Sequence, residues 1–157
     1  MPFLKKIYGR KRHVLVDTLG LLLAVKVHSA GLVDRRGAPL LLQELRGRFP
    51  RLSHLFADSG YTGPLVAWIK MHLGWDTEIV PKPDPWAIIN GELVRLPGGF
   101  QVQRHRWKVE RTLGWLIRYR RLARDYEGLP SSSEALIQIA SIRLFLTRLT
   151  PFRSGAT

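Results

Sequence analysis

The chain has 157 residues, 45% of them hydrophobic, which suits a single domain that buries one core. It carries 25 Lys and Arg against 12 Asp and Glu, a net charge of +13, and this predicts a partner rich in phosphate such as nucleic acid. A basic protein of ribosomal type would share that charge. The lack of cysteine excludes disulfides, thiolate nucleophiles and cysteine zinc sites, and the lack of a long apolar run predicts a soluble, cytoplasmic protein with no membrane partner.

The first third of the chain predicts a hairpin followed by a helix. Residues 13–18 and 21–28 have strand character, and Leu19-Gly20 between them is a turn signal. A helix is expected from Asp34, which can cap it, and Gly47 and Pro50 end it. The predicted apolar stripe of this helix is formed by leucines, namely Leu41, Leu42 and Leu45.

The next segment predicts a strand, a helix and a second strand. Residues 52–57 form a short strand that delivers Asp58 at its carboxyl end. After a loop over 59–64, Pro64 is well placed to open a helix over 65–73, which Gly74 closes. A brief strand over 77–80 follows and is stopped by Pro81. The proline-rich and glycine-rich stretch 81–99 shows little periodicity and is expected to be an ordered excursion or a loop.

The last third of the chain predicts two helices. One runs from near residue 102 or 104 to about residue 125, and the other opens with a capping box at Ser131 and Glu134. The predicted core-facing residues of the last helix are apolar at helical spacings, namely Leu136, Ile139, Ala140, Leu144 and Leu146. We therefore expect one domain over residues 1–150 and a frayed tail over 151–157.

The order of these elements describes an α/β fold, a mixed sheet covered by helices. An RNase H-like fold has the same order, but with one more strand before the hairpin. The sequence thus predicts an RNase H-like mixed sheet flanked by helices and missing its first strand.

Two carboxylates stand out against the basic background. Asp58 follows the apolar run at 55–57, and Glu110 lies in a helix crowded with arginine. Acids in such surroundings hold a metal or pair with a base. Each also has a simpler interpretation: Asp58 can cap a turn, and Glu110 can form an ion pair with Arg106 or Lys108.

Four ordered motifs resemble the catalytic domain of DDE transposases from bacterial insertion sequences. They are Lys-Lys-Ile-Tyr-Gly-Arg-Lys-Arg-His at 5–13, Leu-Val-Asp-Thr-Leu-Gly-Leu at 15–21, Ala-Asp-Ser-Gly-Tyr at 57–61 and Val-Glu-Arg-Thr-Leu-Gly-Trp-Leu at 109–116. The similarity runs from Lys5 to about Arg148. Ala-Asp-Ser-Gly-Tyr alone would be weak, whereas four motifs at fitting separations are specific.

The resemblance implies hydrolysis of a phosphodiester at the transposon end and attack of the freed 3′-hydroxyl on target DNA. It also implies Mg²⁺ ions, for which Mn²⁺ can substitute, held by three carboxylates. By this resemblance Asp58 is the second carboxylate and Glu110 the third, and Arg106 shares the helical face of Glu110. The branch with a Tyr, Arg, Glu and Lys signature would place tyrosine at Gln103 and lysine at Ile117, so this chain departs from it at both positions.

The first carboxylate of the family lies on the strand before the hairpin, upstream of the basic motif at 5–13. Asp17 is the nearby alternative, but its place beside the hairpin turn favours a turn role. The chain is then either the second reading frame of a split transposase or a remnant that binds DNA without cutting it.

The resemblance and the charge together predict contacts with DNA, both transposon ends and target. A basic lead-in precedes the first strand, and an arginine-rich stretch follows Glu110; a solvated helix face is the alternative for the latter. Other predicted partners are a second copy of the chain or the product of an upstream frame. The predicted DNA-binding residues are Lys11, Arg12, Arg106, Arg118, Arg120 and Arg121.

Overall fold

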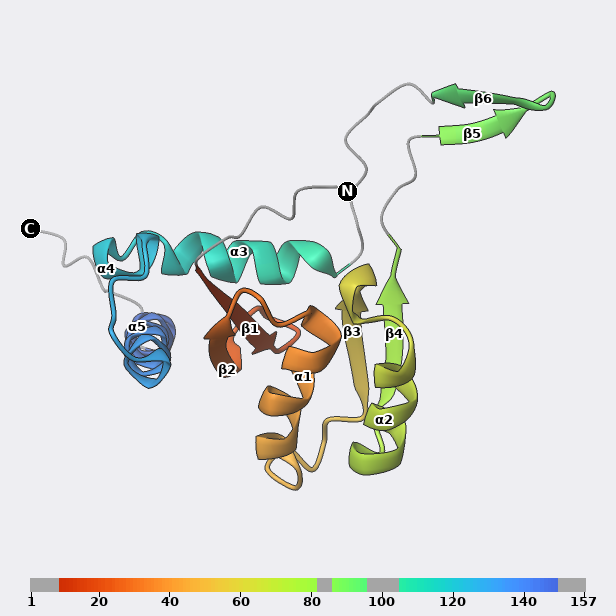
Figure 1. The fold of residues 1–157 in the computed structure, drawn as a ribbon. Coiled ribbons are helices and arrows are strands. Elements are labelled where there is room, and N and C mark those ends of the chain that lie inside the picture. Colours follow the sequence, from red (N-terminus) through yellow and green to blue (C-terminus); the bar gives the residue numbers. More distant parts are fainter. Residues whose placement is uncertain (1–8, 82–85, 96–104, 150–157) are drawn as a thin grey trace, which may run out of the picture. The chain divides into compact units, whose positions relative to one another are not determined.

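A computed structural model of the chain describes residues 9–81, 86–95 and 105–149 (Figure 1). These residues gather into two compact units, one built from the residues up to Arg48 together with those from Lys108 on, and the other from Phe49 to Trp107. The predicted mixture of helices and strands is confirmed. The strands of the described residues pair into three two-stranded sheets, so the single RNase H-like sheet and the number of domains stay predictions, and the tail 151–157 lies outside the described residues.

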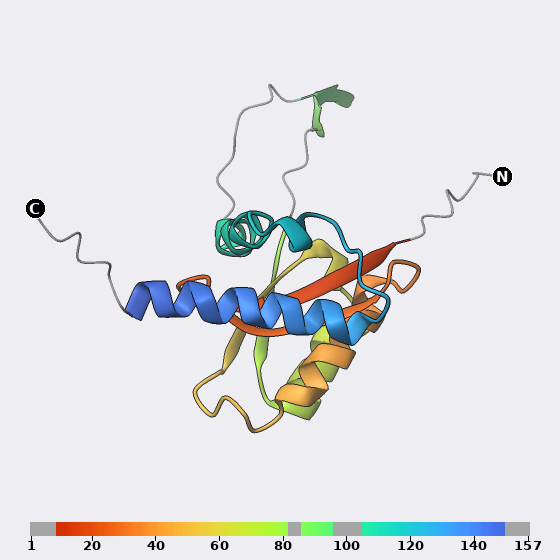
Figure 2. The same ribbon diagram turned by 90° about the vertical axis from the view of Figure 1, so that its left-hand side faces the viewer.

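The predicted hairpin is confirmed and forms the centre of the first unit. Strands β1 (Arg10–Val16) and β2 (Leu22–Ser29) pair antiparallel, with Val14 opposite Val25. Because side chains alternate along a strand, this sheet has two faces. Helices cover both faces, α1 on one side and α5 on the other (Figures 1 and 2).

Helix α1 (Asp34–Leu42) continues into the 3₁₀ turn η1 (Gln43–Leu45). The predicted start and the buried leucines are confirmed. The predicted cap is wrong, because Val33 is the N-cap and Asp34 lies in the first turn. The Asp34 carboxylate instead accepts a hydrogen bond from Lys11 Nζ at 2.9 Å.

The helix predicted to end near residue 125 is interrupted. Helix α3 (Arg106–Leu116) and the short α4 (Arg120–Ala123) are separated at Tyr119, whose backbone is extended (φ −80°, ψ 118°). Tyr119 packs against the core, and its hydroxyl donates to the Ala140 carbonyl at 3.3 Å. The break in the helix therefore turns this aromatic side chain inward. The predicted start near residue 102 or 104 lies outside the described residues.

Helix α5 (Pro130–Leu149) begins one residue before the predicted capping box. Ser131 is therefore inside the helix and is not its N-cap. The carboxylate of Glu134 has a different role, since its Oε1 accepts the backbone N–H of Val27 at 2.8 Å and joins α5 to β2.

Between α5 and β2 lies a core cluster to which β2, α3, α4 and α5 contribute. The predicted inward side of α5 is partly wrong: Ala140 is buried, whereas Ile139 and Leu146 are 62% and 55% exposed. Helix α5 therefore buries fewer of its apolar side chains than the helical spacing predicted. The buried members of the cluster are Leu22, Val25, Val27, Leu116, Leu122, Ile137 and Ala140.

The second unit contains the predicted strand–helix–strand. Strands β3 (His54–Asp58) and β4 (Asp76–Val80) pair in parallel, and they are linked by η2 (Ser59–Tyr61) and α2 (Pro64–Leu73). Pro64 opens α2 as predicted. Gly74 ends it in the left-handed conformation, at φ 74°. This crossover holds the end of β3, and thus Asp58, in a fixed turn.

A hairpin of β5 (Trp86–Ile89) and β6 (Glu92–Arg95) lies in the stretch expected to be an excursion or a loop. Its turn has positive φ at both Asn90 (52°) and Gly91 (82°), as a type I′ turn requires. The Asn-Gly pair between apolar residues was the available signal for this hairpin.

Candidate active site

Asp58 lies at the carboxyl end of β3 and is the N-cap of η2. Its Oδ1 accepts the backbone N–H of Gly60 at 2.8 Å, while the residue as a whole is exposed. The next turn is closed by Thr62 Oγ1, which donates to the Ser59 carbonyl at 3.1 Å. Both interpretations of Asp58 are compatible with this geometry, because capping uses only one lone pair of a carboxylate that has several.

Glu110 lies in the second turn of α3 and is exposed. The two residues that follow it attach the helix to the hairpin turn. Thr112 is buried and its Oγ1 donates to the Gly20 carbonyl, while the Arg111 guanidinium donates to the Leu19 carbonyl. The backbone that carries Glu110 is therefore fixed to the β1–β2 hairpin. The sequence alone predicted no role for Arg111 or Thr112, although both lie in the motif at 109–116.

Asp17 has the turn role that its position favoured. Its Oδ1 accepts the backbone N–H groups of Leu19 and Leu21, each at 2.8 Å. The turn is closed further by the Gly20 N–H, which donates to the Asp17 carbonyl at 3.1 Å. These contacts account for an aspartate at this place without a metal.

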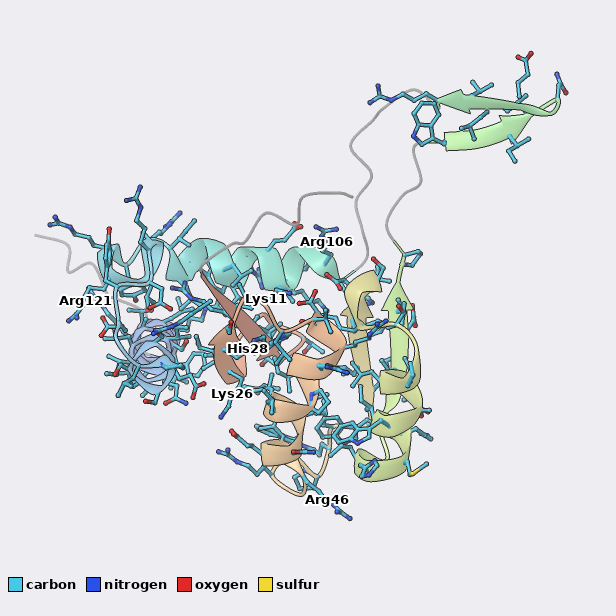
Figure 3. The ribbon with its side chains drawn as sticks, in the orientation of Figure 1. Lys11, Lys26, His28, Arg46, Arg106 and Arg121 are labelled. Carbon is cyan, nitrogen blue, oxygen red and sulfur yellow. The ribbon has the colours of Figure 1, made fainter. Side chains whose placement is uncertain are left out.

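The predicted DNA-binding residues fall into two groups. Lys11 and Arg12 are half-buried and make internal contacts: Lys11 with the Asp34 carboxylate, and Arg12 with the Leu122 carbonyl at 2.9 Å. The others are exposed arginines on or beside α3 and α4, of which Figure 3 labels two. Of these, Arg121 pairs with Glu127 at 2.9 Å. The exposed members are Arg106, Arg118, Arg120 and Arg121.

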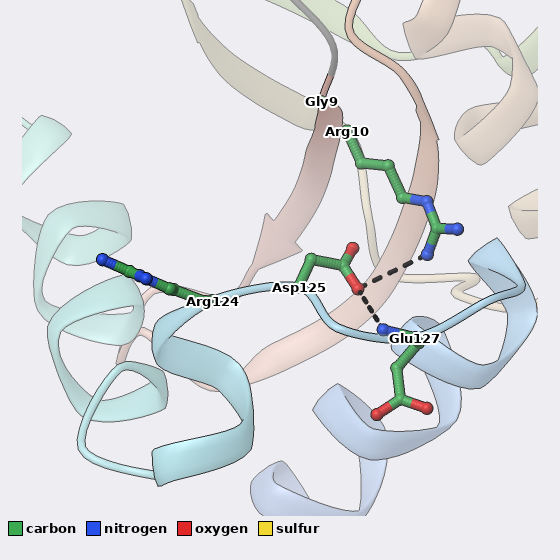
Figure 4. A pocket seen from close by; sticks show the side chains of 5 residues that line it. All are labelled: Gly9, Arg10, Arg124, Asp125 and Glu127. Carbon is green, nitrogen blue, oxygen red and sulfur yellow. Dashed lines mark hydrogen bonds and ion pairs between the residues drawn. The ribbon is translucent and has the colours of Figure 1, made fainter.

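A polar cluster that sequence reasoning missed joins β1 to the start of α5 (Figure 4). The Arg10 guanidinium donates to Asp125 Oδ1 at 3.4 Å and to the Gly128 carbonyl at 2.7 Å. Ser133 Oγ, buried, donates to the same carboxylate oxygen at 2.7 Å. Residues of this cluster line a pocket together with Gly9, Arg124 and Glu127.

Charge and burial act against each other on Asp125. Burial raises the pKa of this carboxyl, but hydrogen bonds from Ser133 and from the backbone N–H of Glu127, and the charges of Arg10 and Arg12, outweigh burial. The pKa of Asp125 is therefore held below its ordinary value. The role of this cluster is structural, because it links β1 to the start of α5.

A family model described as Transposase DDE domain matches residues 4–145. The chain belongs to the transposase DDE domain family. No curated protein and no solved structure matches it. Family membership gives this transposase domain a general role in DNA transposition, with DNA as partner and a divalent metal as the usual cofactor of the family. No helix in the described part of the chain has the length and apolar character needed to cross a bilayer.

The donor chemistry of the candidate site suits a hard divalent cation, since both candidate ligands are exposed carboxylates. Asp58 belongs to the unit from Phe49 to Trp107, and Glu110 belongs to the other. Among residues 9–81, 86–95 and 105–149, no three His, Asp or Glu side chains gather as a metal site. The ligand type suits such a cation, and Asp58 and Glu110 stay the predicted metal ligands.

Proposed function

We propose that this DDE domain is the catalytic domain of a bacterial insertion-sequence transposase, which cuts DNA at the ends of its element and transfers the freed 3′ ends to target DNA. The observation that carries the proposal is the pair of exposed carboxylates at the motif positions, each on a backbone held by specific hydrogen bonds. Asp58 is held by the Gly60 N–H, and the helix of Glu110 is held by Thr112.

In this proposal Asp58 and Glu110 hold Mg²⁺, or Mn²⁺ in its place. Bound cations would activate the attacking water or 3′-hydroxyl and stabilise the leaving oxygen. Asp58 needs little reorganisation to act as a ligand, because its capping bond already fixes the orientation of the carboxylate. Glu110 is positioned by the contact between α3 and the hairpin turn. Arg106 is exposed and lies one helical turn before Glu110, and in this proposal it binds a phosphate oxygen.

In this proposal the main contacts with DNA are made by arginines in the turn after α3 and in α4. Arg118 and Arg120 are exposed, and neither makes an ion pair with another described residue. Arg121 contributes after exchanging Glu127 for phosphate. Lys11 and Arg12 would have to give up internal contacts, so their role in DNA binding is secondary.

The alternative is a DNA-binding remnant that cuts nothing. One observation favours it: the Asp17 carboxylate already accepts two backbone N–H groups of the hairpin turn, and no three His, Asp or Glu side chains of the described residues gather as a metal site. For the active form, we propose that the first carboxylate is supplied by a segment fused upstream. Either form would act where DNA is found, in the cytoplasm of a bacterium.

Cleavage and strand transfer on DNA that carries the native ends of the element tests the proposal, with Mg²⁺ or Mn²⁺ present. The chain, an upstream-frame fusion, and Asp58→Ala and Glu110→Ala versions of both are compared. We expect activity in the fusion that either alanine abolishes. Inactivity of every form, with DNA binding retained, would establish the remnant instead.

A further inference from the structure

Four basic side chains form a block on the face of the β1–β2 hairpin that helix α1 covers. In the antiparallel register Lys11 lies opposite His28, and His13 lies opposite Lys26. Opposite residues point to the same face of a sheet, so the four side chains are neighbours. The two histidines are buried, at 4% and 9% exposed, and their rings stack with centres 4.6 Å apart. Two rings that can each gain a charge are thus buried beside two lysines.

Helix α1 and the turn after it supply one acid to each lysine. Lys11 Nζ donates to Asp34 at 2.9 Å, and Lys26 Nζ donates to Glu44 at 2.6 Å. The hydrogen bond with Glu44 raises the pKa of Lys26, so this lysine stays charged at neutral and mildly acidic pH. Both acids that face the block are therefore already paired with lysines. Other charged groups of these elements are exposed or bond on the α5 side of the hairpin, namely Arg35 and Arg36, and Arg10, Arg12 and Glu134.

Gly37 of α1 lies directly against the two rings. A Cβ at this position would be 2.3 Å from Nε2 of His28 and 2.4 Å from Nε2 of His13, so both nitrogens meet the backbone of the helix. The Nδ1 of His28 donates to the Ser29 carbonyl at 2.8 Å, which leaves Nε2 as the atom that takes up a second proton. Among the described residues this Nε2 has no hydrogen-bond partner. A proton there would create a buried cation beside two lysines, which favours separation of the helix from the hairpin.

Helix α1 has little stability of its own. It is nine residues long and contains Gly37 and Pro39, both of which are poor helix formers in a helix interior. Isolated helices of this length are marginal in water even when their sequence is favourable, so α1 is held by its contacts with the hairpin. A change of charge beneath Gly37 therefore acts on a helix that depends on staying docked.

We propose that proton uptake at the stacked histidines, first at His28, releases helix α1 from the β1–β2 hairpin. A solvated imidazole gains its charge near pH 6.5, so mild acid is sufficient. The docked form takes up this proton less readily than the released form. Docking is therefore complete above about pH 6.5 and is lost progressively as the pH falls below that value. Carboxylates such as Asp125 take up protons only below about pH 5, in a separate range. The inference concerns the folding of one helix and does not rest on the proposed function.

Hydrogen exchange of the full chain, followed by mass spectrometry between about pH 7.5 and about pH 5.5, tests the proposal in the range where imidazole titrates. After correction for the intrinsic exchange rate, the protection of the α1 amides should fall by up to about tenfold per pH unit below about pH 6.5, because one proton is taken up on release. Helix α5 contains no histidine and is the internal reference, whose protection should hold. Unchanged protection of α1, or an equal loss in α1 and α5, would overturn the proposal.

A substitution then assigns the effect to the buried pair. His28→Gln removes a titrating ring and keeps a polar side chain, so the protection of α1 should become nearly independent of pH over the same range. The matched control is His72→Gln, because His72 is exposed on α2 and its Nδ1 also bonds a backbone carbonyl, that of Trp68 at 3.0 Å. This control should leave the pH dependence of α1 intact. Where circular dichroism shows that His28→Gln does not fold, His28→Asn takes its place, since its amide can still donate to the Ser29 carbonyl. A pH dependence that persists at full size in the folded variant would contradict the proposal.

Discussion

The buried hydroxyl of Thr112 donates its hydrogen bond to the carbonyl of Gly20, so that helix α3 and the hairpin turn are locked together two residues from Glu110. Gly20 suits this contact because its φ of 77° is in the left-handed region. A Cβ at this position would also lie 3.2 Å from Thr112 Oγ1. The helix that carries the candidate carboxylate Glu110 is thus held by a turn that lies about 90 residues earlier in the chain.

Replacing Thr112 by valine should destabilise the fold. The change keeps the shape of the side chain but leaves the buried Gly20 carbonyl without this donor, which costs about 1–3 kcal/mol in unfolding free energy. Urea unfolding at neutral pH measures it. Thr147→Val is the control, because the Thr147 hydroxyl is exposed and bonds only within its own helix. If both variants were destabilised equally, the contact between Thr112 and Gly20 would have no special role.

Asp58→Asn and Asp58→Ala should separate the two roles of Asp58. Asparagine retains an oxygen that can accept the Gly60 N–H, so the turn should remain as stable as in the unmodified chain. Alanine loses the cap as well and should cost about 0.5–2 kcal/mol. We expect both to abolish metal-dependent cleavage in the active form. Thermal unfolding and the cleavage assay, run on the same samples, give the two readouts, and activity retained in Asp58→Asn would show that Asp58 is not a metal ligand.

Elements whose start and end are set by nearby turn residues could be predicted from the sequence. The β1–β2 hairpin, the start of α2 at Pro64 and its end at Gly74 follow from turn residues and backbone restrictions within a few positions. The two candidate carboxylates could be predicted because their motifs are short and contiguous, and their role as metal ligands stays a prediction. A type I′ signal at Asn90-Gly91 was present as well, but the surrounding prolines hid it.

Contacts between distant segments could not be read from the sequence in the same way. The break in the helix at Tyr119 depends on the core that its ring packs against, and the inward face of α5 depends on where β2 lies. Ile139 satisfied the helical spacing for a core position, yet it faces outward because the apolar residues surround more of α5 than the sheet can cover. Periodicity indicates a helix, but it does not show which of two apolar sides is buried.

The cluster around Asp125 should make the free energy of unfolding depend on pH in the acid range. The pKa of its carboxyl is lowered in the folded chain, so as the pH falls the unfolded chain takes up a proton at this residue first. The contribution of Asp125 is therefore present above its ordinary pKa of about 3.9 and is lost as the pH falls through the lower folded value. Asp125→Asn should reduce the fall in stability below about pH 5, measured by urea unfolding over a series of pH values. The exposed Asp76, paired with Lys70 at 2.6 Å, is the control: Asp76→Asn should have a smaller effect, since exposed ion pairs contribute little.

Removing Arg118 and Arg120 should weaken binding to duplex DNA of any sequence. For each phosphate that the variant no longer neutralises, the slope of log K against log salt concentration should fall by about 0.9. The control is Arg46→Ala with Arg48→Ala, which removes the same charge from exposed positions near the end of η1. Fluorescence anisotropy over a salt series measures both pairs. Equal weakening by the two pairs would mean that net charge alone binds the DNA and that α4 has no particular part in it.

Replacing either of two helical glycines by alanine should change the stability of the fold, in opposite directions for the two. Gly37 in α1 packs beneath His13 and His28, whose buried rings stack with centres 4.6 Å apart, and an added Cβ would overlap the Nε2 atoms of both rings. Gly114 in α3 has open space at the same position. Alanine normally stabilises a helix interior by about 0.5–1 kcal/mol, and Gly114→Ala should do so. Gly37→Ala should instead destabilise by about 1–3 kcal/mol, the usual effect of overpacking a core. Thermal unfolding of the two variants decides it, and a stabilised Gly37→Ala chain would mean that α1 does not rest on the histidine pair.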